Sequence, residues 1–117
     1  MAKLSTHVLD THSGRPAAGV AIELHALEPA GPRLVASACT NADGRTDRPL
    51  LEGAAVRRGR YRLVFHVGDY FRARGIALPD PAFVDVVPIE FGIAEDQGSY
   101  HVPLVCTPWS YSTYRGS

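Results

Sequence analysis

Residues 20–27 read Val-Ala-Ile-Glu-Leu-His-Ala-Leu, and this stretch decides the fold. Its even-numbered positions, from Val20 to Ala26, are all apolar, whereas Glu23 and His25 occupy odd-numbered positions between them. A period of two is that of a β-strand with one face in a core and the other in water. The stretch therefore predicts a half-buried strand and places His25 on its wet face.

Segments on either side of this strand show the same short, punctuated pattern. We predict further strands over residues 4–10, 33–40, 59–67, 83–91, 100–106 and 109–114, and a short one over residues 45–51. Glycine, proline and asparagine mark turns between them, including a tight turn of Asn-Asp-Gly chemistry over residues 41–44, Asn-Ala-Asp-Gly. Residues 69–74 are the one helical candidate, with Asp69 as its N-cap and Gly75 at its end. Seven or eight short strands with one short helix predict an all-β, two-sheet sandwich.

Size and composition indicate a single domain over residues 1–117, with 45% apolar residues and a core that needs neither metal nor disulfide. Twelve basic residues balance twelve acidic ones, so no basic stripe favours a nucleic-acid partner. The arginines between Arg57 and Arg62 fit a turn and the wet face of a strand. No signal-peptide core or membrane-length apolar run is visible, which predicts no membrane partner and a cytoplasmic location.

The two cysteines, Cys39 and Cys106, are too few and too far apart for a secreted disulfide scaffold. We expect two buried thiols, with a single bridge between them as the alternative.

Chemistry-bearing residues are few. The sequence has no CxxC, HExxH or EF-hand pattern, no phosphate-binding glycine loop and no GxSxG elbow, so no metal or cofactor is expected. His7 and His101 each lie in the middle of a predicted strand, where a ring is held rigidly enough for acid–base work. The remaining histidines, His12, His25 and His66, fit surface or structural roles.

Four stretches of the chain resemble one known family. Residues 4–17, Leu-Ser-Thr-His-Val-Leu-Asp-Thr-His-Ser-Gly-Arg-Pro-Ala, resemble the opening signature of the 5-hydroxyisourate hydrolases, the transthyretin-related proteins. Residues 40–45, 65–71 and 100–104 are similar to further blocks of that family. The ending Tyr114-Arg-Gly-Ser117 is the most specific part, because transthyretins proper lack it. The resemblance covers essentially the whole chain.

The resemblance implies a transthyretin-like sandwich of two four-stranded sheets and a homotetramer with active sites in a channel between dimers. It implies hydrolysis of 5-hydroxyisourate, the product of urate oxidation, to 2-oxo-4-hydroxy-4-carboxy-5-ureidoimidazoline. The catalytic positions that it implies are His7, Arg45, His101 and Ser117. The adjoining tail residues Tyr114, Arg115 and Gly116 are expected to bind substrate.

Ring opening needs a base for water, an acid for the leaving nitrogen and a positive group for the developing oxyanion. His7 and His101 would share the first two roles, and Arg45 would supply the third and favour their neutral forms. A chain terminus is a poor mount for a nucleophile, so Ser117 is expected to hydrogen-bond substrate or water rather than attack. Arg115 would neutralise the terminal carboxylate or bind the anionic substrate.

Two other functions fit the same fold. A transthyretin-like channel can hold a small ligand without reacting, and a structural or adhesive sandwich works through its surface. Titratable groups at three of the expected site positions disfavour a purely apolar ligand.

Overall fold

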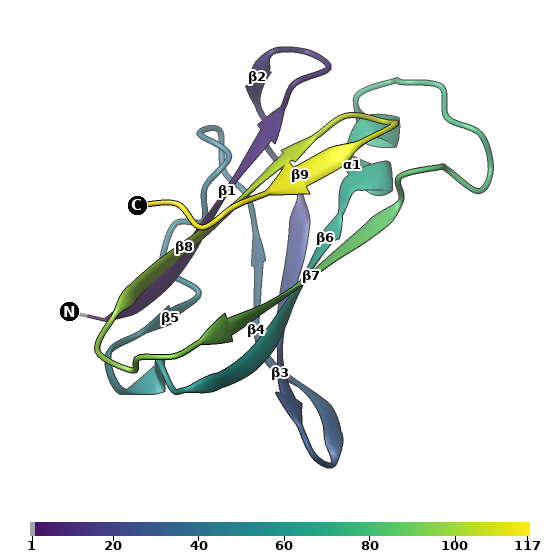
Figure 1. Cartoon of the computed structure of the whole chain (residues 1–117). Coiled ribbons are helices and arrows are strands. Elements are labelled where there is room, and N and C mark those ends of the chain that lie inside the picture. Colours follow the sequence, from purple (N-terminus) through teal and green to yellow (C-terminus); the bar gives the residue numbers. More distant parts are fainter. Residues whose placement is uncertain (1) are drawn as a thin grey trace.

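The computed structural model describes residues 2–117 and, within them, two β-sheets that pack together and a short α-helix (Figure 1). The elements in chain order are β1 (Lys3–Asp10), β2 (Arg15–Pro16), β3 (Ala21–Glu28), β4 (Gly31–Cys39), β5 (Leu51–Glu52), the 3-10 turn η1 (Gly53–Ala55), β6 (Gly59–His66), α1 (Val67–Ala73), β7 (Val86–Ile93), β8 (Ser99–Cys106) and β9 (Tyr111–Thr113). The predicted all-β, two-sheet sandwich is confirmed.

One sheet has five strands and the other has four. The first runs in the order β2-β1-β8-β9, with β5 also paired to β1, and the second runs β4-β3-β6-β7. The two-residue strand β2 has no predicted counterpart, and the two-residue strand β5 overlaps the predicted strand over residues 45–51 only at Leu51. Strands β1 and β8 pair in parallel, so that Ser5 lies opposite His101 and His7 lies opposite Pro103. A strand near the beginning of the chain and a strand near its end are thereby neighbours in one sheet.

The alternation seen in the sequence decides which side chains enter the core. In β3 the even positions Ile22, Leu24 and Ala26 are buried, as predicted. In β1 the even positions are buried and the odd ones are only half-buried or exposed, so His7 points out of the sandwich. In β8 the buried positions include Tyr100 and Val102, which leaves the half-buried His101 on the same outer face. Both expected catalytic histidines therefore face away from the core.

The strand predicted over residues 45–51 is wrong. Only Leu51 belongs to a strand, and Arg45 instead forms an isolated antiparallel β-bridge with His7, which is a pairing of their backbones. The intervening residues contain Pro49, which has no backbone N–H for a ladder. The strand predicted over residues 83–91 also begins later, at Val86, and runs on to Ile93, while Phe83 is 75% exposed.

The helix begins earlier than its sequence signals indicate. Its N-cap is His66, so the prediction of Asp69 as the N-cap is wrong. Asp69 lies inside the first turn of the helix and accepts a 3.1 Å hydrogen bond from Arg72. The burial of Val67 and Phe71 draws these residues into the helix and onto the core. The predicted end is confirmed, since Gly75 follows the helix with a φ of 81°. None of the described helices has the length and apolar character needed to cross a membrane.

The cysteines are only partly as expected. Both are free, so the bridge does not form. Cys106 is buried, and burial raises the pKa of its thiol to about 12. Cys39 is exposed at the end of β4, which corrects the expectation that both thiols are buried.

Asp10 fastens α1 to the end of β1. Its carboxylate is 1% exposed and accepts hydrogen bonds from the backbone of His12 and Ser13, from the Ser13 hydroxyl and from Tyr70. Burial raises the pKa of Asp10, but these hydrogen bonds outweigh that effect and leave it below its ordinary value. Burial, and after it the hydrogen bond to Asp10, raises the pKa of Tyr70 to about 12.

Candidate active site

Arg45 reaches the site through a tight turn that packs on β1. Asn41 organises this turn, since its side-chain oxygen accepts from the backbone N–H of Asp43 at 2.9 Å and of Arg45 at 3.2 Å. Gly44 has a φ of 75°, and a Cβ there would lie 2.5 Å from the Val8 carbonyl oxygen. The predicted Asn-Asp-Gly turn is therefore confirmed, and only glycine lets it approach the strand closely enough to place Arg45 beside His7.

The C-terminal tail reaches the same face from the opposite direction. Strand β9 pairs with β8 through Leu104 and Thr113, and the tail continues along β8 until the Gly116 N–H donates to the His101 carbonyl at 2.7 Å. Ser117 follows directly, so the last residue of the chain lies at His101 although it is not part of a strand.

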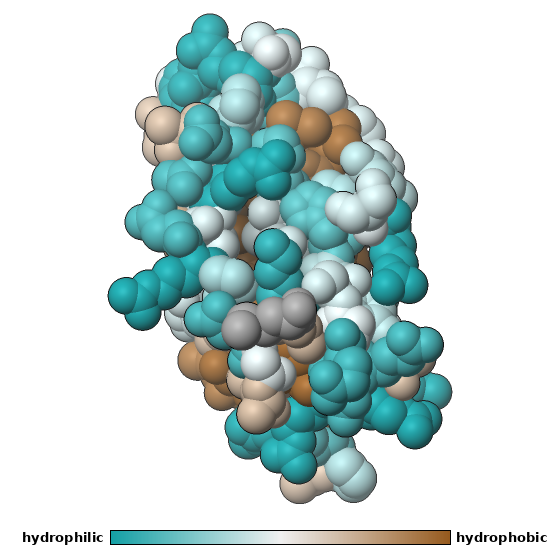
Figure 2. Space-filling view, turned by 90° about the vertical axis from the view of Figure 1, so that its left-hand side faces the viewer, coloured by the Kyte–Doolittle hydropathy of each residue, from teal (hydrophilic) through white to brown (hydrophobic). Residues whose placement is uncertain are grey.

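A cavity of about 280 Å³ lies where these elements meet. Its lining consists of Lys3, Ser5, Arg45, Ser99, Tyr100, His101 and Ser117. His7 stands beside it, two residues beyond Ser5 on the same face of β1 and bridged to Arg45. The C-terminus lies on the left-hand side of the molecule in Figure 1, and the space-filling view of that side is mostly hydrophilic (Figure 2). Three of the residues expected at the catalytic positions thus line one cavity whose lining is mostly polar, and the fourth, His7, lies beside it.

The electrostatics of the site favour neutral histidines. Burial, followed by the nearby Arg45 charge, lowers the pKa of both His7 and His101 below the ordinary 6.5. His101 is lowered further by His7 and Lys3, whereas a hydrogen bond to the backbone of Asp43 partly offsets the shift at His7. At pH 7 both rings are therefore mainly uncharged and able to accept a proton.

The tail residues expected to bind substrate lie in different places. Gly116 is against the His101 ring, where a Cβ would fall 2.5 Å from Cδ2. The Arg115 guanidinium lies over the Tyr100 ring, 4.3 Å from its centroid, and donates to the Ser99 carbonyl at 3.3 Å. Tyr114 is 61% exposed and, with Arg115, lines a separate cleft of about 330 Å³ beside β7. Substrate contacts of these three residues stay predictions.

Sequence reasoning missed Lys3 and Ser5, which also line the cavity. A signal for them was present. Lys3, Ser5 and His7 are alternate residues of one strand and so share a face. Once His7 is a candidate, the period of two makes its polar neighbours candidates as well.

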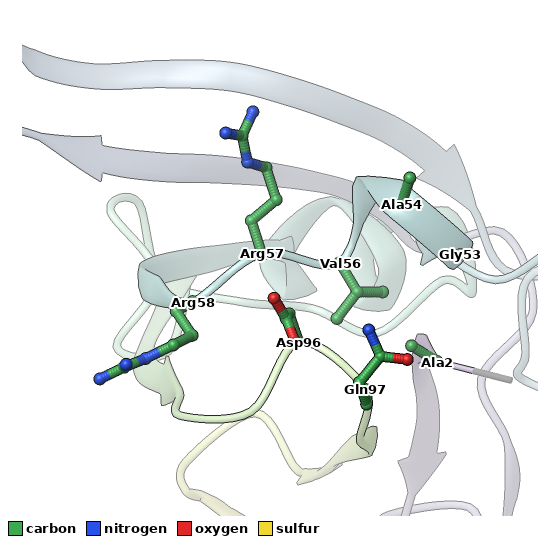
Figure 3. A pocket seen from close by; sticks show the side chains of 8 residues that line it. All are labelled: Ala2, Gly53, Ala54, Val56, Arg57, Arg58, Asp96 and Gln97. Atoms are coloured by element: carbon green, nitrogen blue, oxygen red, sulfur yellow. The ribbon is translucent and has the colours of Figure 1, made fainter.

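A larger cavity of about 760 Å³ lies elsewhere, and none of the predicted site residues lines it. Figure 3 shows that its two arginines, Arg57 and Arg58, point away from each other, while Asp96 adds an opposing charge. No set of donors converges there, so size alone does not make it the active site.

Within residues 2–117, no group of three or more His, Cys, Asp or Glu side chains is arranged to hold a metal ion.

The other histidines make structural contacts. His25 and His66 hydrogen-bond the two carboxylate oxygens of Glu23 at 3.0 Å and 3.1 Å on the outer face of the second sheet. His12 packs edge-on against the Phe71 ring with a centroid distance of 6.1 Å. These contacts fit the surface and structural roles predicted for them.

Fold and site together define a small two-sheet β-sandwich whose polar pocket, built from imidazole and guanidinium groups, opens on the outer face of one sheet. The chain belongs to the HIUase/Transthyretin family, whose model matches residues 4–116.

Known proteins agree with this assignment. The chain is 56% identical over 115 residues to a protein of Rhizobium meliloti (strain 1021) named 5-hydroxyisourate hydrolase 2, covering 98% of this chain and 96% of that protein. It superposes on the 5-hydroxyisourate hydrolase of Klebsiella pneumoniae with a TM-score of 0.82 and 35% identity, over 100% of both chains. It also superposes on a structure titled (S)-allantoin synthase with a TM-score of 0.94 and 43% identity, covering 99% of this chain but 44% of that one.

Proposed function

We propose that this chain is a 5-hydroxyisourate hydrolase, which opens the ring of its substrate to give 2-oxo-4-hydroxy-4-carboxy-5-ureidoimidazoline in urate degradation. The observation that supports this most is the pocket in which His101, Arg45 and Ser117 meet, with His7 bridged to Arg45 at its side. The relatives that share the whole length of the chain carry the same activity in their names.

The reaction needs three kinds of help, and the site offers each of them. A neutral imidazole takes a proton from water as the water oxygen bonds to the carbonyl carbon, an effect worth about 10²–10⁴ in rate. Arg45 stabilises the negative charge that forms on the carbonyl oxygen, on the scale of about 10²–10³ for one such donor. An imidazolium then protonates the ring nitrogen as the C–N bond breaks. No step in this scheme calls for a metal ion or a cofactor.

Ser117 contributes a hydroxyl to the cavity lining. Its neighbour Gly116 is fixed by the backbone hydrogen bond to His101, which removes part of the freedom of a chain end. We assign Ser117 to hydrogen-bond the substrate or the attacking water. Lys3 and Arg45 make the pocket positive, which suits an anionic substrate.

We further propose that the protein is a homotetramer. Strands β7 and β9 each lie at one edge of their sheet, where backbone groups can pair with another strand. Exposed side chains lie on or beside them, with Val86 at 51%, Tyr111 at 47% and Tyr114 at 61% exposure. A second copy that pairs along these edges would cover both features and give a dimer, and two such dimers would make the tetramer that the family resemblance implies. Light scattering should then give four times the 12.6 kDa mass of one chain, and a monomer would contradict this.

The enzyme assay compares the loss of ultraviolet absorbance of freshly made 5-hydroxyisourate with and without protein. We expect decay well above the spontaneous rate, no effect of a metal chelator, and near-complete loss in a variant with His7→Asn and His101→Asn. His25→Asn is the matched control, because that ring contacts Glu23 on the other sheet. Spontaneous decay alone with the unaltered protein would favour the alternative, a transthyretin-like protein that binds a small ligand without reaction.

A cytoplasmic location, which we also propose, is checked by fractionation of the source cells.

A further inference from the structure

The Ser5 hydroxyl touches the ring of a proposed catalytic histidine. Ser5 Oγ lies 2.8 Å from Nδ1 of His101. Both residues sit in the middle of strands and face each other across the parallel β1–β8 ladder. The sheet therefore fixes this contact, which involves no flexible loop.

The direction of this hydrogen bond decides where the ring proton is. A neutral imidazole has one nitrogen that donates and one that accepts. The lowered pKa of His101 favours this neutral form of its ring. Over residues 2–117, the hydrogen bond found for the Ser5 hydroxyl is the one to His101. If the hydroxyl donates to Nδ1, its proton has a partner and the ring proton must be on Nε2. If Nδ1 donated instead, the hydroxyl proton would have to rely on water.

We propose that Ser5 is a positioning residue of this site: its hydroxyl donates to Nδ1 of His101 and thereby holds the ring proton on Nε2. The kinetic consequence of this assignment rests on the function proposed above, whereas the position of the proton does not.

The two histidines then have different roles. A neutral His101 with a proton on Nε2 is too weak an acid to give that proton up, but it can donate a hydrogen bond to the oxyanion beside Arg45. The neutral form of His7 has one ring N–H and one ring nitrogen whose lone pair can accept a proton. His7 takes the proton from water as the oxygen–carbon bond forms, and returns the same proton to the ring nitrogen as the carbon–nitrogen bond breaks. His7 therefore ends the reaction in the neutral form in which it began, and His101 stays neutral throughout.

Nitrogen NMR tests the position of the proton without substrate. Long-range ¹H–¹⁵N spectra of the full-length protein labelled on histidine distinguish the two tautomers, and His101→Asn identifies the His101 signals. We expect the Nε2–H tautomer in the unaltered protein and in Ser5→Thr, and a mixture or the Nδ1–H tautomer in Ser5→Ala. An Nδ1–H tautomer in the unaltered protein, or no change in Ser5→Ala, would overturn the proposal.

Kinetics test the consequence. Ser5→Ala should lower kcat by up to about 10²-fold, the scale of losing one oxyanion donor, with little change in KM. Ser5→Thr, which keeps the hydroxyl, should recover most of the rate. Ser37→Ala is the matched control, since Ser37 is an exposed residue of β4 in the other sheet. A tautomer change in Ser5→Ala with an unchanged kcat would refute the role of His101 as a hydrogen-bond donor. An unaltered protein with the Nε2–H tautomer but no hydrolysis would refute only the proposed function.

Discussion

Gly116 offers the sharpest test of how the chain terminus takes part in the reaction. A methyl group added there would place Cβ 2.5 Å from Cδ2, 3.2 Å from Cγ and 3.3 Å from Cβ of His101. Non-bonded carbon atoms prefer about 3.5–4.0 Å. Gly116→Ala therefore forces the tail and the imidazole apart by roughly 1 Å.

The tail cannot make this move without loss. Its backbone hydrogen bond to the His101 carbonyl, at 2.7 Å, holds Gly116 where the methyl group would clash. A shift of about 1 Å at a reacting group can cost about 10²-fold in rate, which corresponds to about 2.7 kcal/mol of transition-state stabilisation. We expect kcat to fall by roughly that factor, while the free energy of unfolding falls by only about 1 kcal/mol, the scale of one hydrogen bond, because the tail is outside the core.

The assay is the initial rate of 5-hydroxyisourate absorbance loss, corrected for spontaneous decay, together with thermal unfolding of the same samples. Gly92→Ala is the matched control, because a Cβ at Gly92 meets no atom within 4 Å. Retention of more than half of the kcat in Gly116→Ala would refute the argument that the close approach of tail and ring supports turnover.

Three further outcomes follow from the site and its supports. Burial, and after it Arg45, lowers the pKa of His7 and His101 from 6.5, so kcat/KM should fall as the pH drops through the lowered values in a pH–rate profile. The free energy of unfolding should also fall below pH 6.5, because the unfolded chain takes up these protons more readily, and urea titrations at several pH values measure this. Arg45→Gln should lower kcat by about 10²–10³ in the absorbance assay, with the fold intact by circular dichroism. Tyr70→Phe removes the 2.8 Å hydrogen bond to Asp10 and should cost about 1.5–3 kcal/mol in urea unfolding at fixed protein concentration, with kcat unchanged.

Much of the site was readable from local pattern. The period of two in residues 4–10 and 100–106 indicates strands, and in the structure it puts both His7 and His101 on an outer face. The turn over residues 41–44 also follows from its own residues, because Asn41 satisfies the turn backbone with its own side chain. The helix start was less readable, since burial of Val67 and Phe71 overrode the capping signal at Asp69.

By itself, then, the sequence determined most of the strands, the faces of their side chains and the family. Tertiary structure alone decided that β1 and β8 are parallel neighbours, that Arg45 bridges to His7 instead of entering a strand, and that Ser5 meets His101. The reason is physical. Side-chain period is a local property of the backbone, whereas the pairing of strands some 96 positions apart depends on how whole sheets bury their apolar faces.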